Sequence, residues 1–194
     1  MPQPKNPFAN KQRPQYVYEH HVIVGKGLPK PVIPPCIDNH KAVTATTNSS
    51  SIVIITYDDG CQQTRILGTK SWRNNNPGNI EVKKHESNGR FGSIGHNGEF
   101  EIYPDEATGF KAISLLLKTP SYQKKTLQEA IYSWAPPKEN NTVDYSQHIQ
   151  AWANIPLDTK LNTLNDADLE KIAEAIQRQE GWRPGQIQWK KEVK

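Results

Sequence analysis

DADLEKIAEAIQRQEGW, residues 166–182, is the stretch of this sequence that decides its fold. Its apolar residues recur at the i, i+3, i+4, i+7 spacing of one helical face: Leu169, Ile172, Ala173 and Ile176. Asn165 or Asp166 can cap the start of this helix, and Gly181 stands where a helix commonly ends. The spacing therefore predicts an amphipathic helix whose apolar stripe faces a core.

Glu180 lies four residues after Ile176, which places its carboxylate on the apolar stripe rather than on the solvent side. Glu170 and Glu174 fall on other faces and are interpreted as solvated charges. Apolar surroundings disfavour the charged form of a carboxylate, so we expect the pKa of Glu180 to be raised. A raised pKa suits a general acid that works near neutral pH. The alternative is a partly exposed residue whose stem packs and whose carboxylate reaches water.

The length of 194 residues allows one ordinary domain with an appendage, or two small domains. A hydrophobic content of 35% and a mean hydropathy of -0.78 indicate a wet surface or an extended segment. No apolar run approaches the roughly 18 residues that a membrane span needs. The start, MPQPKNP, lacks the apolar core of a secretory signal peptide. If the protein acts outside the cytoplasm, we expect another route of delivery.

The formal net charge of +4 is unevenly placed. Residues 1–70 carry eight Lys/Arg against four Asp/Glu, whereas residues 71–194 carry sixteen of each. A weakly basic arm favours anionic partners, and solubility explains it equally well. There is no dense basic run and no interleaving of basic and aromatic residues, so nucleic acid is not an expected partner.

Residues 1–70 are predicted to form a proline-rich tether and a small β-rich module. Eight of the fifteen prolines fall in residues 1–35, which excludes a long helix there. The strand-forming segments are Tyr16–Val24, Val43–Thr47, Ile52–Tyr57 and Cys61–Leu67. The last two flank Asp58-Asp59-Gly60, which is typical of a hairpin turn with Gly60 at positive φ. Asp58 and Asp59 are alternatively a catalytic pair.

The two cysteines, Cys36 and Cys61, permit one disulfide. The six histidines, including the adjacent His20 and His21, lack the spacing of a metal site. A zinc site could be assembled in three dimensions from distant residues, but the sequence gives no sign of one.

Residues 71–194 are predicted to form a separate α+β domain, mostly helical with one β-hairpin. It begins with an Asn-rich stretch, Trp72–Ile80, whose side chains bond their own backbone and tolerate left-handed conformations. We expect a rigid loop whose amides suit a polyhydroxylated or acetamido sugar. The hairpin is predicted at Gly89–Ile94 and Glu99–Tyr103. Helices are predicted at Asp105–Lys118, Thr126–Trp134, Val143–Ala153 and the opening stretch.

Several short motifs follow one another along this domain. They are Arg73-Asn-Asn-Asn-Pro-Gly-Asn-Ile80, Phe100-x-x-Tyr103, Gly109-Phe-Lys-Ala112, Trp134-Ala-Pro-Pro137, Glu139-Asn-x-Thr142-x-x-Tyr145 and Ala175-Ile-x-Arg-x-Glu180-Gly181. Together they resemble a lysozyme-like domain family found in phage virion proteins and in the muralytic effectors of bacterial type VI secretion systems. The resemblance covers roughly residues 71–185 and leaves residues 1–70 unexplained.

The resemblance implies a peptidoglycan glycosidase with a lysozyme-like fold and no cofactor. In lysozyme-like enzymes the catalytic Glu ends a helix beside a β-hairpin, with an Asn-rich loop nearby. Here that helix would be the last one, and Glu180 would lie next to Arg73–Ile80. Glu180 is then expected to protonate the leaving glycosidic oxygen. Glu86, Glu99 and Glu101 are the candidates for the second carboxylate, and each is also an alternative for the acid itself.

The Asn-rich loop is expected to shape the substrate site and to hold acetamido and hydroxyl groups through Arg73, Asn74, Asn76 and Asn79. Trp72 and Trp182 can stack on sugar faces, and core packing is the alternative for each. Glu139 is interpreted as a helix-start residue that stabilises the helix dipole.

The resemblance also implies a setting. We expect a monomer that is secreted or injected and acts in the periplasm of a target bacterium, with an immunity protein and a secretion apparatus as partners, or a phage lytic domain. The alternative function is a wall-binding or virion-structural module that reads sugars without turnover. A third interpretation, a zinc amidase or peptidase, would need a site built from His and Asp.

Overall fold

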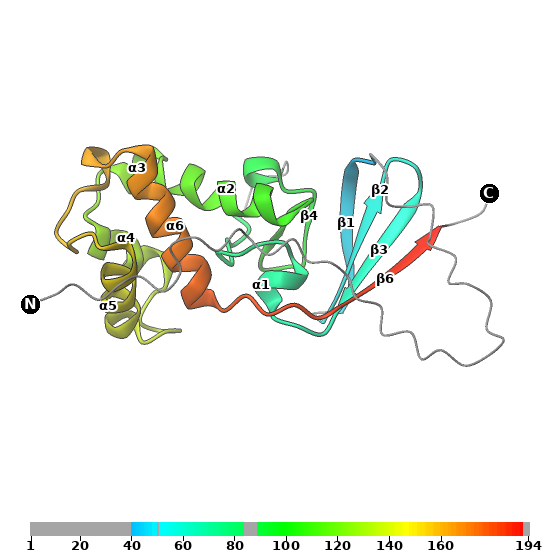
Figure 1. The fold of residues 1–194 in the computed structure, drawn as a ribbon. Helices are drawn as coiled ribbons and strands as arrows, with labels where there is room; N and C mark the ends of the chain where they lie inside the picture. The colour runs from blue at the N-terminus through cyan, green and yellow to red at the C-terminus, as the bar shows by residue number, and fades with distance from the viewer. Residues whose placement is uncertain (1–39, 50, 84–88, 192–194) are drawn as a thin grey trace, which may run out of the picture. The chain divides into compact units, whose positions relative to one another are not determined.

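The computed structural model describes residues 40–49, 51–83 and 89–191, all of which belong to one unit spanning residues 34–194. This part of the chain is of mixed α+β class, as the sequence predicts, with a four-stranded antiparallel sheet and six α-helices (Figure 1). The predicted strand Tyr16–Val24, the His20-His21 pair and Cys36 lie outside the described residues. Among the described helices, none combines the length and the apolar character needed to cross a membrane.

The larger sheet has the order β1-β2-β3-β6. Its strands are β1 (Ala42–Ser49), β2 (Ile52–Tyr57), β3 (Cys61–Ile66) and β6 (Gln186–Lys191). Val53 and Ile55 of β2 are buried with Ala42, Ala45 and Ile102 in a small apolar cluster. The β2–β3 hairpin is confirmed, and Gly60 adopts the expected positive φ of 83°.

Strand β6 comes from the other end of the chain and pairs with β3 along its whole length, from Cys61↔Lys191 to Ile66↔Gln186. Figure 1 shows the chain leaving α6 as an extended segment that leads into β6. This strand is not predicted from the sequence, because QIQWKK has only two apolar residues and most of its positions are exposed. The sheet therefore draws on residues from both sides of residue 70.

The smaller hairpin pairs β4 (Gly95–His96) with β5 (Glu101–Ile102). The second predicted strand contains β5, but the first, Gly89–Ile94, is wrong. That segment contains the short 3-10 turn η1 (Arg90–Gly92), and the positive φ of Phe91 and Gly92, 54° and 90°, is incompatible with an extended strand.

Four long helices match the predicted positions closely. They are α2 (Glu106–Leu117), α4 (Leu127–Trp134), α5 (Thr142–Ala153) and α6 (Asp166–Glu180). The N-cap side chain of each helix accepts a hydrogen bond from a backbone amide of the first turn. In order, these N-caps are Asp105, Thr126, Asn141 and Asn165. The short elements α1 (Lys70–Arg73), α3 (Pro120–Gln123) and η2 (Leu161–Thr163) complete the set. Helix α1 lies partly in the stretch predicted as a loop.

Helix α6 lies against both α2 and α5, and its apolar stripe is buried as predicted. Ile172 and Ile176 are completely buried beside Ile113, Leu117 and Ile149. Burial of this stripe fixes the rotation of α6 about its axis. The end of the helix, and with it Glu180, is therefore held at a defined place in the domain.

Candidate functional site

Glu180 is the last residue of α6 and is partly buried. Each of its carboxylate oxygens accepts one hydrogen bond. Asn79 Nδ2 donates to Oε2 and Tyr145 Oη donates to Oε1, both across 2.8 Å. The structure thus brings Glu180 against the Asn-rich loop, where the resemblance implies that it lies, and fixes the carboxyl plane from two sides.

The environment of Glu180 raises the pKa of its carboxyl above the ordinary value. Burial is the largest cause, because it penalises the charged form. The hydrogen bonds from Tyr145 and Asn79 and the positive charge of Lys70 act in the opposite direction. Their combined effect does not outweigh burial, so Glu180 is disposed to hold a proton at a pH where an exposed Glu has lost it. A carboxyl in this state can act as a general acid.

The Asn-rich loop is held by its own side chains. Asn76 is completely buried, donates through Nδ2 to the carbonyl oxygens of Ile80 and Glu101, and accepts from the Ile80 amide. Asn75 and Asn79 adopt left-handed backbone conformations, with φ of 49° and 45°. These turns direct the Asn79 side chain to Glu180 while Asn76 points inward.

The predicted substrate contacts of Asn74 and Asn76 are therefore corrected. The two residues are 1% and 0% exposed, so neither side chain faces a polymer outside the protein. Arg73 Nη1 donates to the carbonyl oxygens of Leu67 and Gly68, which ties the loop to the end of β3. Of the four predicted loop residues, Asn79 is the one placed at the Glu180 carboxylate.

The two tryptophans proposed to stack on sugar have different environments. Trp72 is 6% exposed and lies under the guanidinium of Arg65, which is 4.1 Å from the ring centroid. Of the two interpretations of Trp72, packing in the protein interior is therefore the correct one. Trp182 is partly exposed and lies two residues after Glu180 in the sequence, and its stacking on a sugar stays a prediction.

Segment 181–185, which follows Glu180, lies along residues 68–71. Ser71 Oγ donates to the Gly181 carbonyl oxygen across 3.1 Å. The Thr69 amide donates to the Arg183 carbonyl oxygen, and the Arg183 amide donates to Thr69 Oγ1. The two segments approach so closely at Gly68 that a Cβ there would lie 2.6 Å from the amide nitrogen of Gly185. Helix α1 is thereby fixed against the end of α6.

The candidates for the second carboxylate occupy different environments. Glu101 is 4% exposed and accepts a hydrogen bond of 2.5 Å from Ser93 Oγ, so its carboxylate is enclosed. The side chain of Glu99 is 78% exposed, and its Oε2 lies 4.0 Å from Lys70 Nζ. Glu86 lies outside the described residues. Of the two described candidates, Glu99 is the one accessible to a substrate.

Two residues of the site are not among the sequence-predicted candidates. Tyr145 is 4% exposed and reaches Glu180 from α5, and Lys70 acts on Glu180 from α1. Tyr145 occurs in the Glu139–Tyr145 motif, and its position there was the available signal. Glu139 is exposed and lies two residues before Asn141, the N-cap of α5; its effect on the helix dipole stays a prediction.

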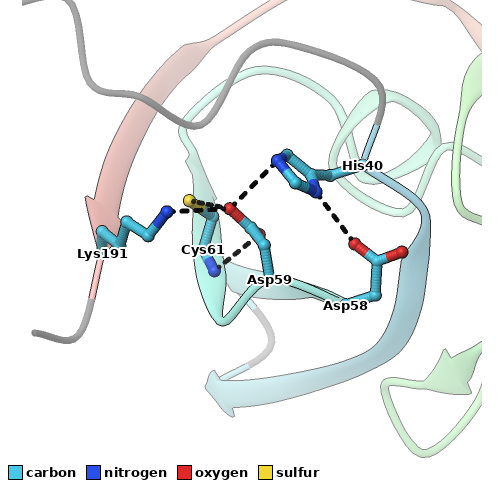
Figure 2. Close-up of polar contacts among 5 residues, drawn as sticks. All are labelled: His40, Asp58, Asp59, Cys61 and Lys191. Carbon is cyan, nitrogen blue, oxygen red and sulfur yellow. Dashed lines mark hydrogen bonds and ion pairs between the residues drawn. The ribbon is translucent and has the colours of Figure 1, made fainter. Parts of the chain in front are cut away.

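A second polar cluster lies at the β2–β3 turn (Figure 2). His40 Nδ1 lies 3.1 Å from Asp58 Oδ1, His40 Nε2 lies 3.4 Å from Asp59 Oδ2, and Lys191 Nζ lies 3.2 Å from the same Asp59 oxygen. Burial opposes ionisation of Asp59, but the Cys61 amide, Lys191 and His40 hold its pKa below the ordinary value.

This cluster has the donor set of a metal site, with three ligand atoms within 4.8 Å of one another. However, His40 directs a different ring nitrogen to each Asp, and the ammonium of Lys191 already neutralises Asp59. The arrangement is that of an ion-pair cluster that ties β6 and the start of β1 to the turn, which agrees with the interpretation of Asp58 and Asp59 as turn residues. Cys61 beside it is completely buried and disulfide-bonded.

The geometry around Glu180 therefore supplies a half-buried acid with two fixed hydrogen-bond donors, an adjacent cation and an exposed carboxylate on the nearby hairpin. Comparison of the sequence with protein-family models and with curated proteins found no match.

Proposed function

We propose that this chain is a peptidoglycan glycoside hydrolase with a lysozyme-like catalytic part, in which Glu180 is the general acid. One observation carries the proposal: Glu180, the last residue of α6, has a raised pKa, and Asn79 and Tyr145 hold its carboxyl group in place. A lysozyme-like arrangement is supported by the proximity of that helix end to the Asn-rich loop and by the hairpin that packs on the loop through Asn76.

The proposed reaction begins with the transfer of the Glu180 proton to the bridging glycosidic oxygen as the C1–O bond breaks. Positive charge then develops on the sugar ring, and an exposed carboxylate opposite the acid stabilises it or positions a water molecule. Glu99 is the described residue best suited to this role, because it is accessible and lies on the hairpin next to Lys70. Water adds to C1 and releases the proton that restores the acid.

The substrate assignment rests on the motifs that resemble muralytic domains. The Asn79 amide supports the acid rather than the sugar, since its Nδ2 donates to Glu180 and its Oδ1 is buried. Under the same proposal the protein is a monomer delivered to the periplasm of a target bacterium, with an immunity protein as a partner, or a phage lytic domain.

The test is digestion of purified peptidoglycan by the wild type and by Glu180→Gln, with the products read by mass spectrometry. Glu174→Gln is the matched control, because Glu174 is an exposed acid on the same helix. We expect disaccharide-peptides with new reducing ends from the wild type and from the control. The rate with Glu180→Gln is expected to fall by about 100- to 10,000-fold.

Other outcomes decide between the alternatives. Full activity of Glu180→Gln would move the acid to another residue. Freed stem peptides would indicate an amidase instead of a glycosidase. Binding of peptidoglycan without any product, by the wild type as well, would support the wall-binding or virion-structural module.

A further inference from the structure

Lys70 is placed beside Glu180 by its two sequence neighbours. Thr69 exchanges backbone and hydroxyl hydrogen bonds with Arg183, and Ser71 Oγ donates to the carbonyl oxygen of Gly181. The backbone of Lys70 is therefore fixed on both sides to residues one and three positions after Glu180. A lysine held in this way has little freedom to leave the end of α6.

The ammonium of Lys70 also faces the hairpin. Lys70 Nζ lies 4.1 Å from the ring centroid of Phe100 and 4.0 Å from Glu99 Oε2. The Phe100 ring provides a cation–π surface that restricts where the ammonium can lie. The Lys70 side chain remains 44% exposed, so a substrate can approach it.

Lys70 thus acts on two carboxyl groups from different elements: it lies 4.0 Å from the Glu99 carboxylate, and its positive charge favours ionisation of Glu180. Two carboxylates near one substrate bond repel each other when both are charged, and a cation between them reduces that repulsion. Such a cation favours the state that a glycosidase needs, in which the exposed carboxylate is charged while the buried one exchanges a proton.

We propose that Lys70 is a positioning residue of the catalytic site, whose charge holds Glu99 toward Glu180 and lowers the cost of ionising Glu180 after proton transfer. This inference rests on the proposed function, since it assigns Lys70 a part in the same reaction. Lys70 is described as positioning because it acts through the two carboxyl groups.

The other groups that bear on Glu180 must be counted with Lys70. From α5, Tyr145 donates to the carboxylate, and Tyr145 in turn interacts electrostatically with Tyr122 of α3. From the loop, Asn79 donates without a charge. Within the described residues, Lys70 is the cation whose charge lowers the pKa of Glu180, so its removal isolates the effect of charge.

The experiment compares Lys70→Gln, which removes the charge, with Lys70→Arg, which keeps it. Lys171→Gln is the control, because Lys171 is an exposed lysine that pairs with Asp168 on the far end of α6. Each protein is titrated by NMR of the Glu180 side-chain carboxyl carbon, and its pH–rate profile on peptidoglycan is recorded alongside.

We expect Lys70→Gln to raise the pKa of Glu180, to move the basic limb of the pH–rate profile to higher pH by the same interval, and to lower kcat about tenfold or more, the scale of one lost charge interaction. Lys70→Arg and Lys171→Gln are expected to follow the wild type. A titration curve of Lys70→Gln that superimposes on that of the wild type would overturn the proposal, and so would an equal shift in Lys171→Gln. If the wild type does not cleave peptidoglycan, the proposed function fails on its own evidence, while the NMR titration still decides whether Lys70 and Glu180 are coupled.

Discussion

Tyr145 Oη and Glu180 Oε1 are joined by a hydrogen bond of 2.8 Å that links α5 to the last residue of α6. The Tyr145 side chain is almost entirely buried, so water does not compete strongly for this bond. The pKa of the Tyr145 hydroxyl is well above its ordinary value because of burial and the negative charge of Glu180. Tyr145 therefore remains a neutral donor at the pH values where Glu180 titrates.

Replacing Tyr145 with Phe keeps the packing of the ring and removes this donor. The hydrogen bond favours the charged carboxylate, so we expect the pKa of Glu180 to rise further in Tyr145→Phe. The rate at neutral pH is expected to fall about tenfold, the equivalent of one hydrogen bond to a charged group. A pH–rate profile measures both effects. Tyr132→Phe, on the exposed face of α4, is the control, and an unshifted basic limb in Tyr145→Phe would show that the hydroxyl does not act on ionisation.

The raised pKa of Glu180 also predicts how stability depends on pH. The folded protein binds this proton more tightly than the unfolded chain, so the contribution is complete below the ordinary pKa of Glu. It is lost as the pH rises through the higher folded-state pKa. Glu180→Gln cannot titrate, so it should unfold at a higher urea concentration than the wild type at about pH 8, with the difference shrinking toward about pH 4. Glu174→Gln should follow the wild type, and equal midpoints for Glu180→Gln and the wild type at the higher pH would refute the prediction.

Asn79→Asp tests the hydrogen bond to Oε2 of Glu180, whereas Tyr145 donates to Oε1. It places a second carboxylate where Asn79 Nδ2 now lies, 2.8 Å from Glu180 Oε2. Two like charges at this distance do not both ionise readily, so the pair should take up a proton at a higher pH than Glu180 alone. A difference titration against the wild type measures this proton. Asn154→Asp is the control, because Asn154 has a similar left-handed φ of 55° at the exposed end of α5; the same proton uptake in both variants would contradict the prediction.

The sequence predicts α6 well because all its determinants are local. The apolar spacing, the Asn165 cap and Gly181 lie within one stretch, and together they place Glu180 on the buried side. The partner Tyr145 could not be deduced in this way, since its direction depends on how α5 rotates against α6. That rotation is set by packing over the whole core.

The asparagines of the loop show a second limit. In the sequence, Asn74, Asn76 and Asn79 are equivalent amides, and their substrate contacts are predicted alike. The structure separates them through backbone conformation, because the left-handed turn at Asn79 directs its amide to Glu180 while Asn76 bonds the backbone of Ile80 and Glu101. The choice among similar residues is made by tertiary hydrogen bonds that no local pattern encodes.

Replacing Gly109 with Ala tests how firmly the Asn-rich loop is held against α2, because the expected change in stability has the opposite sign to that of a usual Gly→Ala replacement in a helix. In the interior of a helix, Gly→Ala commonly stabilises by about 1 kcal/mol. At this position in α2, however, a Cβ would overlap the carbonyl oxygen of Asn75. We therefore expect Gly109→Ala to destabilise the protein by about 1–3 kcal/mol, measured by urea unfolding. Lys111→Ala, at an exposed position of the same helix, should not destabilise by this amount, and a stabilised Gly109→Ala would show that the loop moves away freely.

The pairing of β3 with β6 closes residues 67–185 into a loop whose two ends are fastened side by side. Everything that forms the site lies within that closed loop, including the contact of Thr69 with Arg183 just beyond the ladder. The alignment of Glu180 with Asn79 thus depends on a sheet that fastens the residues before α1 to the residues after α6.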